Sequence, residues 1–181
     1  MKITQTAIPE VLVLEPQVFE DDRGAFYESF NARRFAALTG TTLNFVQDNF
    51  SRSGRNVLRG MHYQVLQSQG KLVQVTVGEV FDVAVDLRRS SPSFGCWVGN
   101  LLSANNRLQH WIPPGFAHGF LVTSAHADLL YKATDYYAPE HERIVHWQDE
   151  SIGVHWPLQG SPLLSAKDMQ AGRLKNAELF D

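Results

Sequence analysis

Two histidines lie in otherwise apolar, strand-like stretches of this sequence. His62 is in residues 57–64 (VLRGMHYQ), and His118 follows the tight turn of residues 113–115 (PPG). An imidazole titrates near neutral pH, so it can accept or return a proton during catalysis. A strand histidine is also commonly a plain core or surface residue. Both interpretations of these two side chains stay open on this pattern alone.

Arg59 stands three residues before His62 in the same stretch. Simple strand alternation places the two side chains on opposite faces, because successive residues of a strand point to opposite sides. Gly60, between them, is a residue type at which a β-bulge can reset that phase. If Arg59 and His62 serve one site, the chain must have a bulge or kink at Gly60.

Three further side chains could support proton chemistry. Lys71 shares its parity with the valines of residues 73–77, so it is either a cation at a cavity mouth or a side chain that snorkels to solvent. Tyr131 shares a face with Leu129, and it either packs as a buried tyrosine or donates a proton. Asp168 follows Ser165 by three residues, which also fits an abbreviated capping box at a helix start.

The segment from Phe19 to Glu28 offers an arginine and a carboxylate beside aromatic rings. Arg23 and Gly24 follow two aspartates, and Glu28 comes four residues after Gly24. One interpretation is a solvated turn followed by the wet face of a strand. The other is a ligand contact, in which the planar Arg23 fork binds phosphate oxygens.

A metal centre is not expected. The chain has seven histidines but no His-x-His pair, and we count at most two candidates for the convergent ligands that a metal needs. No Gly-rich dinucleotide fingerprint is present either. The sequence therefore predicts chemistry without a cofactor.

Short strands must position these residues. Residues 71–77 and 80–86 alternate β-branched side chains on either side of Gly78-Glu79, which predicts a hairpin. Further strands are expected at residues 97–102, 109–112, 119–123, 128–133 and 144–147. Turns rich in Pro, Asn and Gly separate them. Many short, closely spaced strands indicate an all-β sandwich or barrel.

Helix is expected in two places only. Asn31 can cap a short helix over residues 32–38, which Gly40 would end, and a second helix begins after Ser165. No repeat, low-complexity tract or compositional break marks a linker. The sequence predicts one domain over residues 1–181.

Composition narrows the class of protein. The chain has 181 residues, of which 44% are apolar and 19% charged, with a formal net charge of −3. An acidic balance argues against general nucleic-acid binding, which needs a basic surface. The single Cys96 fits a reducing compartment, and no signal peptide or membrane-spanning run is visible. We expect a cytoplasmic protein.

Taken together, these segments resemble the dTDP-4-dehydrorhamnose 3,5-epimerase family of the nucleotide-rhamnose pathway. The resemblance covers about residues 3–170, and the turn before His118 also resembles the second half-motif of the cupins. The matching segments are Phe19…Arg23-Gly24…Glu28, 47–49 (QDN), 58–64 (LRGMHYQ), 70–73 (GKLV), 78–86 (GEVFDVAVD), 114–120 (PGFAHGF), 131–134 (YKAT) and 164–168 (LSAKD). The tail after Met169 diverges.

The resemblance implies a cupin-like jelly-roll β-barrel with short peripheral helices, no metal or other cofactor, and a homodimer. It implies that His62 is the base, paired with Asp168, that Tyr131 is the opposing acid and that Lys71 lies near the sugar carbonyl. Implied contacts to nucleotide or sugar are Phe19, Arg23, Glu28, Gln47, Asn49, Arg59, His118, Glu142 and Lys167, with Glu142 in the weakest match. Arg23 and Glu28 would reach into the partner subunit's site.

The expected substrate is a dTDP-linked 4-keto-6-deoxyhexose, whose ketone acidifies the hydrogens on C3 and C5. Alternatives on the same scaffold are a single-centre epimerase and a 3,4-ketoisomerase of such a keto-sugar. Two alternatives belong to other classes of protein: a non-catalytic binding module for sugar nucleotides and a metal-dependent dioxygenase. A pure binder needs no acid and base together, and a dioxygenase needs metal ligands that the sequence lacks.

Overall fold

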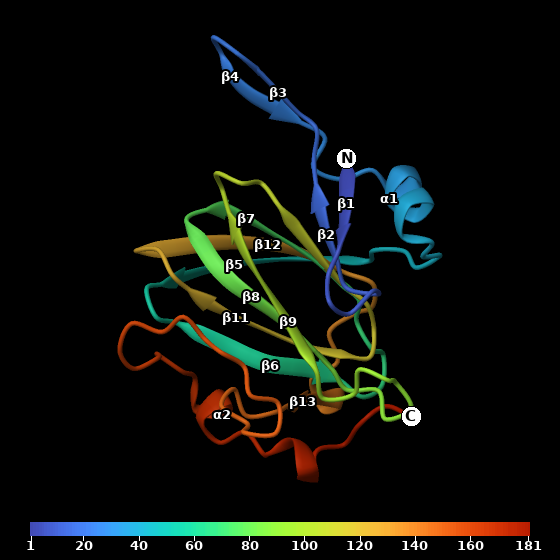
Figure 1. Ribbon diagram of the computed structural model, residues 1–181, viewed down its shortest axis with the longest axis vertical. Helices are drawn as coiled ribbons and strands as arrows, with labels where there is room; N and C mark the ends of the chain where they lie inside the picture. Colours follow the sequence, from blue (N-terminus) through green and yellow to red (C-terminus); the bar gives the residue numbers. More distant parts are fainter.

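Two antiparallel sheets stacked face to face make up most of the structure, a computed structural model that describes residues 1–181 (Figure 1). The first sheet has the order β1 (Lys2–Gln5), β2 (Leu12–Glu15), β10 (Gln109–Ile112), β7 (Lys71–Val77), β12 (His126–Ala133) and β5 (Gln47–Gly54). The second has the order β13 (Glu142–Ile144), β6 (Leu58–Gln64), β11 (Phe116–Val122), β8 (Glu79–Asp86) and β9 (Trp97–Ser103). The predicted all-β, jelly-roll class is confirmed.

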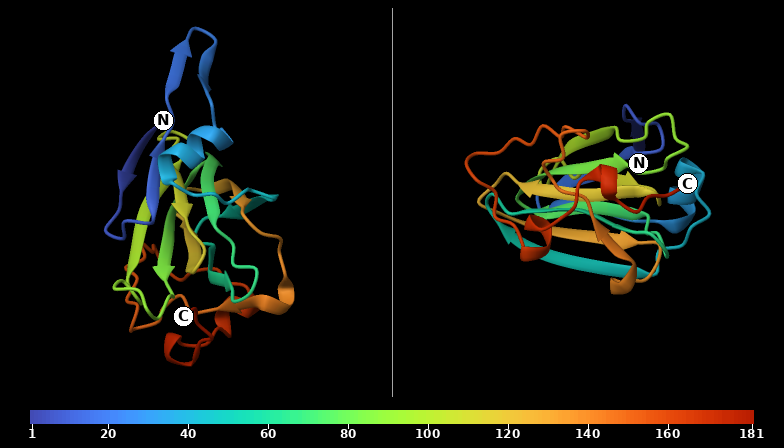
Figure 2. Two further views of the ribbon diagram at one scale, coloured as in Figure 1. Left: turned by 90° about the vertical axis from the view of Figure 1, so that its right-hand side faces the viewer. Right: turned by 90° about the horizontal axis from the view of Figure 1, so that it is seen from below.

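Both faces of the central strands are buried. The inner faces of the two sheets share a core of 14 residues, among them Val73 of β7, Ala84 of β8 and Leu129 of β12. The outer face of the second sheet is covered by the chain after residue 150, where Ile152 and Leu174 pack against it. This cover, visible at the base of the molecule in Figure 2, explains why β8 is apolar on both sides.

The predicted hairpin over residues 71–86 is wrong. β7 pairs with β10 and β12 in one sheet, whereas β8 pairs with β11 and β9 in the other. Gly78, with a φ of +74°, turns the chain from one sheet into the next, and a Cβ there would collide with the carbonyl oxygen of His126. The alternation of side chains along the sequence predicts a turn between two strands, but it does not predict which sheet each strand joins.

Both predicted helices are present. α1 (Ala32–Thr39) is capped by Asn31, whose side chain accepts a hydrogen bond from the Arg34 backbone, and Gly40 ends it in the left-handed conformation. α2 (Ala166–Met169) is a single turn, and two 3-10 helices cover Pro139–His141 and Leu174–Asn176. α1 covers the outer face of the first sheet through Phe35. No helix is long and apolar enough to cross a membrane.

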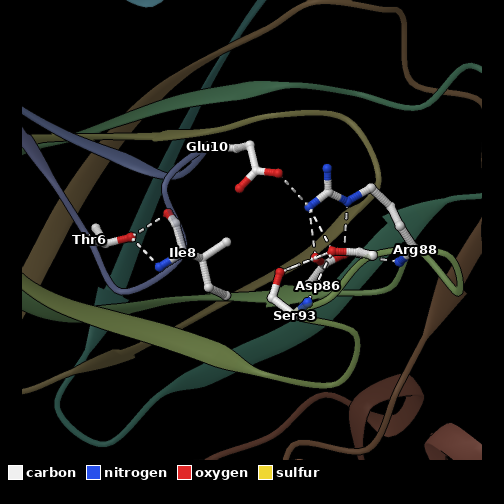
Figure 3. A network of polar contacts seen from close by, with 7 residues as sticks. Thr6, Ile8, Glu10, Asp86, Arg88 and Ser93 are labelled. Carbon is white, nitrogen blue, oxygen red and sulfur yellow. Dashed lines mark hydrogen bonds and ion pairs between the residues drawn. The ribbon is translucent and has the colours of Figure 1, made fainter.

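A buried carboxylate ties the end of β8 to the N-terminal loop (Figure 3). Asp86 accepts hydrogen bonds from Arg88, Ser91 and Ser93, and the Arg88 guanidinium also contacts Glu10 at 3.2 Å. Hydrogen bonds from an ionised partner are the stronger kind, so this network stabilises the corner of the barrel.

The N-terminal part differs most from the sequence-based strand assignment, which placed the strand signals mainly after residue 43. β3 (Val18–Asp21) and β4 (Gly24–Tyr27) form a separate two-stranded hairpin, here called the arm, which projects beyond the barrel at the top of Figure 1. Phe19 and Phe26 are directly opposed in it and are 57% and 71% exposed. The arm pairs with neither sheet, and its Glu20 contacts Arg107, in the loop after β9, at 3.1 Å.

The bulge required at Gly60 is present. In the pairing of β6 with β11, His62 lies opposite His118 and Arg59 lies opposite Phe120, so β6 has one residue more than its partner between these positions. Gly60 has a φ of +134°, and an added Cβ would lie 2.6 Å from Gly119 Cα. The extra residue brings Arg59 and His62 to the same face, as predicted.

This close approach predicts that Gly119 does not tolerate a side chain. A Cβ at Gly119 would lie 2.5 Å from Met61 Sδ and 2.8 Å from the Arg59 carbonyl oxygen. We expect Gly119→Ala to lower the free energy of unfolding by about 2 kcal/mol, the usual cost of overpacking. Gly54→Ala, in a strand with nothing within 4 Å, is the matched control. Equal urea midpoints for the two variants would contradict the bulge packing.

Candidate active site

His62 of β6 and Asp168 of α2 form a close pair. His62 Nε2 lies 2.6 Å from Asp168 Oδ1, and the carboxylate is buried whereas the imidazole is 31% exposed. Burial alone would raise the pKa of Asp168, but hydrogen bonds from His62 and Ser165 lower it below its usual value. The ionised carboxylate fixes the His62 proton on Nε2 and leaves Nδ1 as the basic nitrogen.

The Ser165-x-x-Asp168 spacing caps a helix, as the capping-box interpretation predicted. The Ser165 hydroxyl accepts a hydrogen bond from the Asp168 backbone N–H, as an N-cap does, and donates to Asp168 Oδ2 at 2.8 Å. The helix start therefore also holds the carboxylate in place. Its second oxygen remains free to face His62.

Tyr131 comes from the sheet opposite His62. It lies on β12 with Leu129 and Ala133 on its inward face, and both of those residues are fully buried. His118 lies between the two groups: it pairs with His62 across β11 and β6, and its ring centroid is 6.5 Å from that of Tyr131. Burial raises the pKa of Tyr131, so its phenol keeps its proton near neutral pH.

Lys71 begins β7 and points inward with Val73. Burial lowers the pKa of Lys71 to about 8, while the negative charges of Asp82 and Glu142 act in the opposite direction. A lysine with this pKa is mostly protonated at pH 7. It faces the same interior as Tyr131, whose neighbour Ala133 pairs with it across the two strands.

A row of polar side chains lines the inward face of β5, the edge strand beside Tyr131. Gln47 Nε2 donates to Asn49 Oδ1 at 2.8 Å, and Asn49 pairs with Tyr131. Arg59 crosses from β6 and donates from Nε to the Ser53 hydroxyl at 3.1 Å, which leaves the rest of its guanidinium exposed. These donors suit a ligand that carries phosphate or hydroxyl oxygens.

Glu142 and Lys167 form a second close pair. Lys167 Nζ lies 2.8 Å from Glu142 Oε2, and the hydroxyl of Tyr137 donates to the same oxygen at 3.3 Å. The backbone of Tyr137 donates to Gln47 Oε1. Sequence reasoning missed Tyr137, although a pair of tyrosines just before Pro139 was a visible signal for an exposed aromatic surface.

The three predicted contacts from the N-terminal segment do not reach this site within one chain. Phe19 and Arg23 lie on the arm, and Arg23 bonds only to Asp21 there. Glu28, at the base of the arm, pairs with Arg34 at 3.0 Å.

Two more interior groups escaped sequence analysis. Asp82 and His110 are fully buried, and the Asp82 carboxylate accepts hydrogen bonds from both His110 and His118. The valine-rich context of Asp82 hid it, although a lone carboxylate in such a strand was itself a signal. No group of three or more His, Cys, Asp or Glu side chains is arranged to hold a metal ion.

The arrangement can transfer protons on two sides of a small ligand. A basic imidazole nitrogen comes from one sheet, and a protonated phenol and a lysine ammonium come from the other. Arg59, Gln47 and Asn49 supply further hydrogen-bond donors from β6 and β5. Such a set suits proton abstraction next to a carbonyl in an anionic substrate.

Comparison with known proteins agrees with this chemistry. The family model for dTDP-4-dehydrorhamnose 3,5-epimerase matches residues 5–176. The chain is 59% identical to the Pseudomonas aeruginosa protein of that name over 99% of both chains, and 56% identical to the Salmonella typhimurium protein over the full length of both.

This chain is also similar to a solved structure. The crystal structure of the Legionella pneumophila dTDP-6-deoxy-D-glucose-3,5-epimerase, in complex with dTDP-4-keto-L-rhamnose, superposes with a TM-score of 0.96 at 55% identity. The match covers 98% of this chain and 94% of that one. This chain belongs to the dTDP-4-dehydrorhamnose 3,5-epimerase family.

Proposed function

We propose that this protein inverts C3 and C5 of dTDP-4-keto-6-deoxy-D-glucose to give dTDP-4-dehydro-L-rhamnose, by acid–base proton transfer without a cofactor. The observation that carries the proposal is the His62–Asp168 pair, which faces the inside of the barrel opposite Tyr131. Family membership supports the substrate class.

His62 is the base in this mechanism. The C4 ketone acidifies the neighbouring C–H bonds, because the electron pair left by deprotonation delocalises onto the carbonyl oxygen as an enolate. Nδ1 of His62 takes the proton, and the ionised Asp168 stabilises the imidazolium that forms. The lowered pKa of Asp168 keeps its carboxylate charged throughout.

Tyr131 is the acid on the opposite face, and Lys71 stabilises the enolate. Inversion requires that the new proton arrive from the side opposite the one that was lost, and the phenol comes from the opposing sheet. A cation aimed at the enolate oxygen acts mainly on the transition state, where one such donor is worth about 3 kcal/mol. Lys71 is the protonated amine available there.

The remaining polar groups bind the nucleotide and sugar. Arg59, Gln47 and Asn49 supply donors from β5 and β6, while His118, Glu142 and Lys167 face the same end of the barrel. Arg59 suits a diphosphate oxygen because its guanidinium is planar and partly free. We place the reaction in the cytoplasm, since the lone Cys96 suits a reducing compartment.

We also propose a homodimer in which the arms are exchanged. An isolated two-stranded hairpin is barely stable in water, and the opposed Phe19 and Phe26 rings form an exposed apolar patch on it. The outer side of β5 carries a second exposed ring, Phe50. Exchange would bring Phe19, Arg23 and Glu28 into the partner's site, where the Phe19 ring could stack on thymine.

Deuterium incorporation tests the reaction itself. The keto-sugar nucleotide is incubated with enzyme in D₂O and the product is weighed by mass spectrometry. We expect two deuterons per molecule, because each inverted carbon exchanges its hydrogen with solvent. One deuteron would show a single-centre epimerase, and none would show a binding module; either result would refute the proposal.

Removal of either member of the base pair tests the assignment of roles. We expect His62→Asn and Asp168→Asn each to lower kcat by about 10²–10⁴-fold, the usual contribution of a positioned general base. His126→Ala, an exposed histidine at the start of β12, is the matched control and should keep full activity. Wild-type kcat in Asp168→Asn would show that the pair is only structural.

Mixing two inactive variants tests the exchange of arms. Arg23→Glu and His62→Asn subunits are refolded together from denaturant and assayed. If the arm serves the partner's site, half of the dimers are mixed and one of their two sites is intact, so activity should reach about a quarter of wild type. If each arm serves its own subunit, every site carries a defect. A mixture no more active than its parents would overturn the exchange.

A further inference from the structure

Asp82, on β8, is a fully buried carboxylate with a hydrogen-bond donor on each oxygen. Oδ1 lies 2.7 Å from His110 Nδ1, and Oδ2 lies 2.7 Å from His118 Nε2. Burial alone would raise the pKa of Asp82, but the two imidazoles hold it well below its usual range. Asp82 is therefore a permanent negative charge inside the barrel, directly behind His118.

The hydrogen bonds define how both imidazoles are protonated. The Asn100 amide nitrogen lies 3.2 Å from His110 Nε2, and an amide nitrogen can only donate, so Nε2 is unprotonated and the His110 proton is on Nδ1. His118 donates to Asp82 from Nε2, and its burial lowers its pKa. The hydrogen bonds therefore put a single proton on His110, at Nδ1, and they leave Nδ1 of His118 as an acceptor.

The negative charge of Asp82 also favours the protonated form of Lys71. His110 pairs with Val73 and Lys71 pairs with Ile112, so the lysine and His110 lie in adjacent inward rows of β7 and β10. The charged and titratable groups that face the Lys71 ammonium are Asp82, Glu142 and His118. Of the two carboxylates, Asp82 is fully buried, whereas Glu142 already contacts Lys167.

We propose that Asp82 and His110 are positioning residues that keep the Lys71 ammonium charged and hold His118 in a single tautomer. The proposal rests on the enolate-stabilising role given to Lys71 above. Neither residue has surface that a substrate could touch. His110 orients the carboxylate through Oδ1, which aims Oδ2 at His118, and the charge of the carboxylate stabilises the protonated lysine.

The first experiment measures the Lys71 pKa without using activity. Trace acetylation of Lys71 with acetic anhydride, followed by mass spectrometry across a pH series, reports how much of the amine is free. We expect Asp82→Asn to lower that pKa by about one unit or more, as loss of a nearby opposite charge does. Asp86→Asn removes another fully buried carboxylate of β8 and should leave the value unchanged.

The same variants are then followed by turnover. The alkaline limb of the kcat profile should move to lower pH in Asp82→Asn and should be absent in Lys71→Arg, whose guanidinium does not titrate. His110→Leu should lower kcat about tenfold with little change in KM, and His110→Asn, which can keep a donor near Nδ1, should restore most of it. If no deuterium is incorporated but Asp82→Asn still lowers the Lys71 pKa, the proposed reaction is refuted, whereas the interaction between Asp82 and Lys71 stands.

An unshifted Lys71 pKa in Asp82→Asn, or an equal shift in Asp86→Asn, would overturn the inference. Nitrogen NMR of the wild-type protein gives a test that needs no variant. At pH 7, His110 should carry its proton on Nδ1 and His118 on Nε2. A doubly protonated His118, or the opposite tautomer of either ring, would overturn it as well.

Discussion

Ionisable side chains between two apolar sheets must find charged or hydrogen-bonding partners, and this requirement shapes the interior of the protein. A buried carboxylate without partners is strongly disfavoured. Asp168 satisfies this requirement through hydrogen bonds with His62 and Ser165, and Asp82 does so through hydrogen bonds with His110 and His118. The hydrogen bonds that stabilise each buried carboxylate also define the tautomer of the histidine partner and lower the pKa of the carboxylate. The same contacts therefore stabilise the fold and prepare the chemistry.

The barrel supplies geometry that no single strand has. A regular β6 would send Arg59 and His62 to opposite faces, and the bulge at Gly60 brings both inside. The close approach of Gly60 and Gly119 makes that bulge possible, because a side chain on either would strike the neighbouring strand. The acid and base then come from different sheets, so a ligand between them is approached from both sides.

Much of this could be predicted from local pattern. Short strands, both helix caps and the bulge follow from residue type and spacing, and the motifs around His62 and His118 indicated the site. The β7–β8 hairpin was wrong because alternation is blind to which sheet a strand joins, and that choice depends on partners far along the chain, such as β10 and β12. His110 was overlooked for the same reason: its partner Asp82 is 28 residues away.

In the proposed mechanism, the opposed sheets also account for how one base can serve two carbons. C3 and C5 flank the same ketone, so either enolate places its charge on one oxygen, and a single Lys71 suffices for both. Small shifts of the sugar ring would present C3 or C5 to His62 while the phenol of Tyr131 stays on the other face. In the proposed mechanism, the number of centres inverted then depends on how far the sugar can move between the base and the acid.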